Sequence, residues 1–194
     1  HRRLISLAHI ATESPLAARS EYAVFSLGMG LDADVVAVSD RRPASKYYFA
    51  SAKFAGIAAN QVIRNYHSRL ATMTVECAGE RVHAASVLVQ VHDSYTYWGR
   101  LPLRFAADPG DGPTAMVVER LSVPVTLGLA SRALLGGHFP KQKGAHVFHE
   151  FEKLIVHAEP ASAFQADGEL LGQADSVEIT PAYDALSVIA PGRD

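Results

Sequence analysis

The chain has 194 residues, of which 48% are hydrophobic and 20% are charged, which is the composition of a globular domain with a sizeable core. Its formal net charge of −2 creates no overall field that would attract nucleic acid, so no nucleic-acid partner is expected. The single cysteine, Cys77, excludes an internal disulfide, and no apolar run reaches the roughly 18 residues of a membrane-spanning helix.

The first third of the chain predicts a strand over Leu4–Ile10, a strand over Tyr22–Leu27 and a short helix over Asp32–Ser39. A long helix is expected over Ser45–Tyr66, because its apolar residues recur at steps of three and four. The chain begins with His1 and not with Met, so we expect either a fragment or a processed or trimmed chain.

A glycine motif, Gly28-x-Gly30-x-x-Ala33, separates the second strand from the short helix and has the shape of a dinucleotide-binding fingerprint. A Rossmann site needs a second parallel strand soon after the helix, but the next strand is expected only near Thr72. Asp32 and Asp34 would also repel a pyrophosphate. We therefore interpret the motif as a tight glycine turn that leaves a core strand.

The centre of the chain predicts a hairpin, with strands over Met73–Cys77 and Arg81–Val91 around a turn at Ala78–Glu80. An aromatic loop follows at Ser94–Gly99, and its Tyr95, Tyr97 and Trp98 would either dip into a bilayer interface or fold back into the core. Both alternatives remain open.

The last part of the chain predicts a strand over Ala115–Glu119 and a helix over Val123–Leu135, with Ser122 as the N-cap and Pro124 in the first turn. Short strands with tight turns are then expected, over Lys153–His157, Ala163–Ala166, Ser176–Thr180 and Leu186–Ile189. These elements predict an α+β fold class, mainly an antiparallel β-sandwich with a few helices, in a single domain.

Two interpretations fit the stretch FQADGELLG, which contains Asp167 and Gly168 between two apolar runs. Asp-Gly in that position is typical of a β-hairpin turn. Alternatively, Asp167 and Glu169 form a carboxylate pair that accepts a proton from a hydroxyl group or helps to hold Mg²⁺ near phosphates.

Histidines gather in the same half of the chain, at His138, His146, His149 and His157. Their spacing does not match the helical H-E-x-x-H pattern, so no metal site is predicted from them. Cys77 lies in an expected strand and is interpreted as a small core residue and not as a nucleophile.

Several of these motifs, in this order, resemble the C-terminal domain of the diacylglycerol kinase and sphingosine kinase superfamily, in particular the bacterial lipid kinases. The resemblance covers essentially the whole chain. The matching segments are Arg2–Ile10, Phe25–Val36, Arg41–Tyr66, Val91–Gly99, the Asp167-Gly168-Glu169 turn and Ala185–Ile189.

The resemblance implies a two-domain enzyme whose active site lies between the domains. ATP and Mg²⁺ would be bound mainly by an N-terminal domain with a GGDGT-type motif, which this chain lacks. The β-sandwich would supply the lipid side for a lipid alcohol such as diacylglycerol, although sphingoid bases and other lipid alcohols stay open. The resemblance further implies a cytoplasmic protein with peripheral membrane contact, and leaves a homodimer open.

The resemblance also implies roles for individual residues. Asp167 would be the base for the lipid hydroxyl, with Glu169 as its partner and Gly168 on the cofactor side of the same turn. The segment from Gly28 to Asp34 would line the lipid side, with substrate-binding roles for Gly28, Gly30, Asp32 and Asp34. The loop over Gly144–His149 lacks the acidic residues of the structural magnesium site found in bacterial members, so that site is not predicted. The alternative function is a non-catalytic lipid-binding or interaction module.

Overall fold

The computed structural model describes residues 2–13, 18–40, 60, 64, 71–98, 101–105, 112–135 and 144–190. The long helix expected over Ser45–Tyr66 lies almost wholly outside the described residues. The elements are named in chain order: β1 (Arg2–Glu13), β2 (Arg19–Ala23), β3 (Ser26–Gly30), α1 (Leu31–Asp40), β4 (Met73–Cys77), β5 (Glu80–Ala84), β6 (Ser86–Gln90), β7 (Thr96–Trp98), β8 (Leu101–Leu103), β9 (Thr114–Val118), α3 (Val123–Leu134), β10 (Ala145–Phe148), β11 (Leu154–Ala166) and β12 (Glu169–Ile189).

One ten-stranded sheet forms the body of the protein, and a separate two-stranded sheet joins β7 to β8. The strands of the large sheet follow the order β10-β9-β6-β3-β11-β12-β1-β2, and β4 joins β11 to β5. Every strand pair described is antiparallel. The mainly antiparallel α+β fold predicted from the sequence is therefore confirmed.

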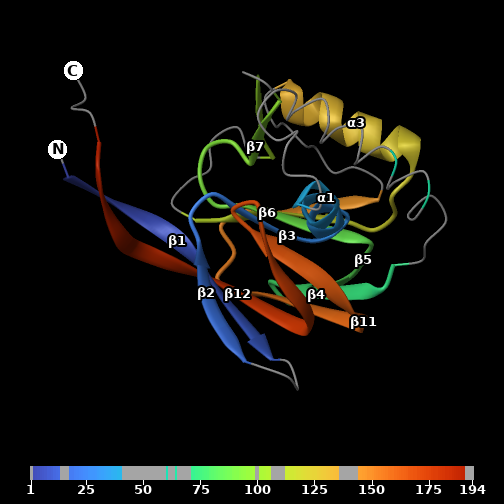
Figure 1. The fold of residues 1–194 in the computed structure, drawn as a ribbon, viewed down its shortest axis with the longest axis horizontal. Helices are drawn as coiled ribbons and strands as arrows, with labels where there is room; N and C mark the ends of the chain where they lie inside the picture. Colours follow the sequence, from blue (N-terminus) through green and yellow to red (C-terminus); the bar gives the residue numbers. More distant parts are fainter. Residues whose placement is uncertain are drawn as a thin grey trace.

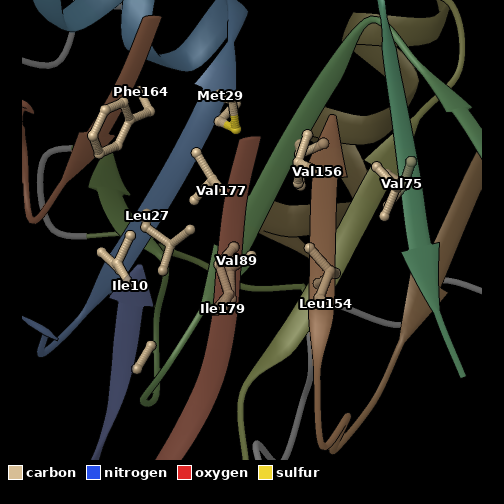
Figure 2. Packing of buried hydrophobic residues seen from close by; sticks show 14 of the residues in the cluster. Ile10, Leu27, Met29, Val75, Val89, Leu154, Val156, Phe164, Val177 and Ile179 are labelled. Carbon is tan, nitrogen blue, oxygen red and sulfur yellow. The ribbon is translucent and has the colours of Figure 1, made fainter. Parts of the chain in front are cut away.

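The sheet divides at β11, which is why it can enclose a core. The first half of β11 pairs with β4, from Leu154↔Cys77 to Ala158↔Met73, and the second half pairs with β3. The register of β11 against β12 shifts between His157 and Ser162, at the point where the neighbour changes. The sheet thus has two arms, one of β4 and β5 and the other of β3, β6, β9 and β10. Apolar side chains from both arms pack into one large cluster, as expected for a sandwich (Figure 2).

Alternation along the central strands separates two apolar cores. In β6, Val87 and Val89 belong to the large cluster between the arms, whereas Leu88 packs on a second cluster. That second cluster also contains Leu129 and Ala133 of α3, and Leu31 at the start of α1 packs against it. Both helices therefore cover the same side of the sheet (Figure 1).

Local signals fix α3 as predicted. The Ser122 side chain accepts a hydrogen bond from the Val125 amide at 3.4 Å, and a proline lies in the first turn. The helix ends at Leu134, one residue before the predicted end. A cap and a pre-organised proline act within one turn, so the sequence alone is sufficient to locate this helix.

Two of the predicted strands are each divided in the structure. The strand expected over Tyr22–Leu27 is interrupted, because β2 ends at Ala23 and β3 begins at Ser26. The glycines expected to form a turn after it lie inside β3, and α1 follows directly at Leu31. The strand expected over Arg81–Val91 is likewise divided at Ala85, whose amide donates to the Val118 carbonyl at 2.8 Å.

Strand β12 is longer than predicted, since one strand replaces the two short ones expected over its second half. Its last part pairs with the start of β1, from Arg2↔Ile189 to Ile5↔Leu186. This two-stranded ribbon projects from the body, with both ends of the chain at its tip (Figure 1). The sequence predicted only parts of it, within Leu4–Ile10 and Leu186–Ile189, and not their pairing, because side chains on both faces of the ribbon are exposed or half-buried.

Candidate functional site at the turn between β11 and β12

The Asp167-Gly168 turn joins β11 to β12 directly, since β11 ends at Ala166 and β12 begins at Glu169. Both turn residues have positive φ, +50° for Asp167 and +82° for Gly168. That is the conformation of a type I′ hairpin turn, in which aspartate and glycine are tolerated best. The hairpin interpretation of this sequence is confirmed.

The Asp167 carboxylate binds the linker between β2 and β3. Its Oδ1 accepts hydrogen bonds from the amides of Phe25 and Ser26 at 2.8 and 2.9 Å, and its Oδ2 accepts one from the amide of Val24 at 2.8 Å. The Asp167 amide in turn donates to the Ser26 carbonyl at 2.8 Å. These bonds replace strand pairing in the linker, which explains why the expected strand is interrupted there.

Gln165 connects the turn to the first turn of α1. It lies on β11 opposite Gly28, and only 3% of its surface is exposed. Its Oε1 accepts a hydrogen bond from the Gly168 amide at 2.9 Å, and its Nε2 donates to Asp32 Oδ2 at 2.5 Å. Both ends of a buried amide are therefore satisfied, as burial requires.

Asp32 receives a second hydrogen bond on the same oxygen, from the Tyr95 hydroxyl at 2.6 Å. Burial raises the pKa of the Asp32 carboxyl, while the hydrogen bonds from Tyr95 and Gln165 act in the opposite direction. Burial, and the adjacent Asp32 carboxylate, raise the pKa of the Tyr95 hydroxyl. Tyr95 therefore keeps its proton and acts as a donor.

The two glycines of the β3–α1 junction are explained by close packing. A Cβ on Gly28 would lie 2.2 Å from Asp32 Oδ2, so only glycine leaves room for that carboxylate. Gly30 has φ of +78°, and a Cβ there would lie 2.7 Å from the Ala85 carbonyl oxygen. Since the sheet beside them is antiparallel, the junction lacks the βαβ geometry of a dinucleotide site.

The structure thus brings Gly28, Asp32, Asp167 and Gly168 together, and Glu169 follows the turn as the exposed first residue of β12. Asp34 is half-buried and lies two residues after Asp32, a spacing that does not share a helix face. Gly30 packs against β6 and not against the turn.

Sequence analysis missed Gln165 as a site residue. The available signal was an amide between two apolar residues, Phe164 and Ala166, directly before the Asp-Gly turn. A polar residue in an apolar run needs a partner, but nothing in the sequence indicates that the partner is Asp32.

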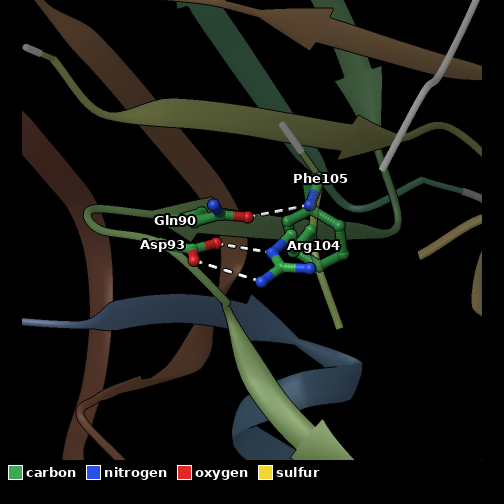
Figure 3. Close-up of polar contacts among 4 residues, drawn as sticks. All are labelled: Gln90, Asp93, Arg104 and Phe105. Atoms are coloured by element: carbon green, nitrogen blue, oxygen red, sulfur yellow. Dashed lines mark hydrogen bonds and ion pairs between the residues drawn. The ribbon is translucent and has the colours of Figure 1, made fainter. Parts of the chain in front are cut away.

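Tyr95 folds back into the core, which settles one of the alternatives for this residue. It is 8% exposed, and its ring lies 4.6 Å from that of Phe105. The base of the β7–β8 hairpin is fixed nearby, where Arg104 donates to Asp93 at 2.5 and 3.1 Å and the Phe105 amide donates to Gln90 Oε1 at 2.8 Å (Figure 3). The side chains of Tyr97 and Trp98 lie outside the described residues.

The histidines take separate partners. His146 Nε2 lies 2.6 Å from Glu119 Oε1, His149 Nδ1 lies 3.4 Å from Thr114 Oγ1, and His157 is exposed on β11, while His138 lies outside the described residues. In the described part of the chain, no three His, Cys, Asp or Glu side chains are grouped so that they could hold a metal ion.

Cys77 is a buried core residue, as predicted. Burial, and then the charge of Glu80, raise the pKa of its thiol to about 11, so the thiolate that a nucleophile requires is disfavoured. An open surface depression lies beside it, at the β4–β5 hairpin between Arg81 and Lys153, and does not include the Asp167 turn.

Among the described residues, no helix is long and apolar enough to cross a membrane.

The fold and the turn together define a class of protein: an antiparallel sandwich that carries helices on one side and an acidic Asp-Gly-Glu turn held by buried polar side chains.

Solved structures with this fold include three diacylglycerol kinase structures from Bacillus anthracis str. Sterne. The first carries the name "putative diacylglycerol kinase"; it aligns with a TM-score of 0.62 and 12% sequence identity, over 96% of this chain and 56% of that chain. A second, of the same name, aligns with a TM-score of 0.58 over 57% of its length, and a third with 0.52 over 53%, both at 12% identity. No family model and no curated protein matches the sequence.

The chain therefore has the fold of the C-terminal portion of these kinases and spans little more than half of their length. This confirms the fold that the family resemblance implied.

Proposed function

We propose that the chain is the lipid side of an ATP-dependent lipid kinase that phosphorylates a lipid hydroxyl group, with diacylglycerol as the acceptor and phosphatidic acid as the product. One observation supports this most directly. On a sandwich with the diacylglycerol kinase fold, the Asp167-Gly168-Glu169 turn presents acidic side chains at the surface. The buried Gln165 side chain holds this turn by accepting a hydrogen bond from the Gly168 amide.

In the proposed reaction, the lipid oxygen forms a bond to the γ-phosphorus of ATP, the bond to the ADP oxygen breaks, and the hydroxyl proton passes to a carboxylate. The sequence-based hypothesis assigned that proton to Asp167. Both oxygens of Asp167 accept backbone hydrogen bonds, so protonation would weaken the attachment to the β2–β3 linker. Glu169 is exposed and its side chain makes no hydrogen bond to the described residues, so we assign the proton to Glu169 and the positioning of the turn to Asp167.

Mg²⁺, which the kinase fold implies, prefers oxygen ligands and neutralises charge on transferring phosphates when bound. In this turn the Asp167 oxygens already hold three amides, and Glu169 is assigned the proton of the lipid hydroxyl. The turn by itself therefore does not make a magnesium site. We propose that the ligands for ATP and Mg²⁺ come mainly from a separate ATP-binding domain, and that Gly168 would lie next to the phosphates held there.

The lipid-facing surface is proposed at the α1 end of the turn. Asp34, the second acidic residue in the first turn of α1, is the candidate to hold a polar head group. Gly28 and Gly30 would shape the wall by letting the backbone and Asp32 approach closely. Access to such a substrate would involve peripheral contact of a cytoplasmic protein with the membrane.

The test is transfer of labelled phosphate from ATP to diacylglycerol in mixed micelles. The chain would be tested joined to the proposed ATP-binding domain, and the 194-residue chain alone is the control. Transfer by the longer protein and not by the control is the expected result. Absence of transfer from both folded proteins, with several lipid alcohols tried, would contradict the kinase assignment and favour the non-catalytic lipid-binding module.

A further inference from the structure

We propose that Gln165 is a positioning residue that fixes the acidic turn relative to α1, with Asp32 and Tyr95 as its support. This inference rests on the proposed function, because it names what holds the proposed catalytic turn in place. The three side chains come from β11, from α1 and from the residue before β7, and none of them reaches the reacting groups in this role.

The contacts of Gln165 are those of a bridge. A buried amide is costly unless it is hydrogen-bonded, and here each end has one partner on a different element. The Oε1 end accepts from the Gly168 amide inside the turn, at 2.9 Å, and the Nε2 end donates to Asp32 Oδ2, at 2.5 Å. Any rotation of the turn away from α1 would break one of the two bonds.

Asp32 gives the bridge a fixed point. Its Oδ2 lies 2.2 Å from the position that a Cβ on Gly28 would take, so the carboxylate occupies space that only a glycine at this position of β3 leaves open. On the other side the Tyr95 hydroxyl holds it at 2.6 Å, and the Tyr95 ring is fixed against Phe105. Because one acceptor oxygen receives two donors, the geometry of Gln165 follows from that of Asp32 and Tyr95.

Asp167 holds the turn along a second direction. Its carboxylate attaches the turn to the β2–β3 linker through three amides, whereas Gln165 attaches it to α1. With both attachments, the backbone of the turn is fixed, and this sets the direction in which the Glu169 side chain leaves it. Since a misplacement of about 1 Å in an active site can cost roughly 100-fold in rate, loss of one attachment should be visible in turnover.

The first experiment compares Gln165→Met with Thr12→Val in the complete kinase. Thr12 is the matched control, because it is also a buried polar side chain whose oxygen accepts one backbone amide, that of Arg19 at 3.2 Å, but it connects β1 to β2 and not the turn to α1. We expect Gln165→Met to lower kcat roughly 10- to 100-fold with little change in KM for ATP, and Thr12→Val to leave kcat within about twofold. Equal kcat for the two variants would overturn the inference.

A rescue pair covers the case in which Gln165→Met does not fold. Gln165→Glu places two carboxyl groups at hydrogen-bond distance from each other, which is unfavourable. Adding Asp32→Asn to Gln165→Glu restores a donor opposite an acceptor. The amide introduced by Asp32→Asn can donate to the carboxylate introduced by Gln165→Glu, and the Tyr95 hydroxyl can rotate to accept from the same amide. Recovery of kcat in the double variant supports the bridge, and a double variant no better than Gln165→Glu argues against it.

Hydrogen exchange separates this inference from the kinase assignment. In Gln165→Met the Gly168 amide loses its acceptor and should exchange faster, whereas the amides of Val24, Phe25 and Ser26 remain bonded to Asp167 and should not. This measurement needs no activity. If no lipid is phosphorylated by the wild type, the proposed function fails, but faster exchange confined to Gly168 still supports the bridge, and unchanged exchange overturns it.

Discussion

Glu169 and Asp167 stand two residues apart at the turn, yet their environments predict different consequences of mutation. Glu169→Gln removes the proposed proton acceptor and leaves every backbone bond of the turn intact. We expect turnover of the complete kinase to fall by about 10²- to 10⁴-fold, with an unchanged melting temperature. Steady-state phosphate transfer and thermal unfolding measure the two quantities, and a Glu169→Gln enzyme with full turnover would remove Glu169 from the mechanism.

Asp32 should couple folding to pH. Its pKa is raised in the folded protein above the usual 3.8, so the folded state holds this proton more firmly than the unfolded state does. As pH falls from above the raised pKa to below 3.8, Asp32 therefore adds stability, and as pH rises through that window the stability is lost.

The Asp32→Asn variant isolates this effect, because an amide oxygen can still accept from Tyr95 and Gln165 but cannot titrate there. We expect wild type to gain stability relative to Asp32→Asn on acidification through the window, as measured by urea unfolding at a series of pH values. A difference between the two proteins that is constant with pH would show that burial does not control this carboxyl.

At the scale of elements, the Asp167 side chain accepts the backbone hydrogen bonds that a neighbouring strand would accept elsewhere in the sheet. Asp167→Asn should lower the free energy of unfolding by about 1 to 2 kcal/mol, since an amide nitrogen must then face one of the three backbone amides. Urea unfolding compares it with Glu169→Gln, which lacks this contact. If Asp167→Asn is as stable as wild type, the linker between β2 and β3 is held by other means.

The same contact shows what could and could not be predicted from the sequence. Helix α3 and the Asp-Gly turn depend on residues within a few positions of one another, and both were predicted correctly. The interruption between β2 and β3 depends on a carboxylate 141 to 143 residues away, and the Gln165–Asp32 bond joins residues 133 apart. A pattern read along one strand contains no information about such partners, so the site residues were proposed from resemblance and not from contacts.

For the whole molecule, polar side chains tie together parts of the chain that the strand order alone would leave independent. Tyr95, directly before the β7–β8 hairpin, bonds to α1, Gln165 bonds β11 to α1, and Asp167 bonds the turn to the linker between β2 and β3. The large core between the two arms, in contrast, is built from apolar residues. Apolar packing therefore sets the fold, and the polar contacts set the orientation of the proposed site.

The ribbon of β1 and β12 has a consequence for how copies of the protein meet. β2 pairs with β1 only from Ala8 to Thr12, and β11 pairs with β12 only as far as Ile179, so beyond these points each ribbon strand has an unpaired edge among the described residues. Exposed strand edges recruit further strands, and Ile189 adds an apolar side chain that is 90% exposed.

Arg2 and Arg3 lie on that edge, and like charges on two copies repel when strands align side by side. Replacing both with threonine, a residue suited to strands, should therefore increase concentration-dependent association, most visibly at low salt, where wild type is protected best. Sedimentation velocity over a concentration series measures this association. Lys153→Thr, at the residue directly before β11, is the control for loss of a positive charge elsewhere. Edge-to-edge association of the isolated chain would then be controlled by two arginines of the ribbon, away from the turn that carries the proposed chemistry.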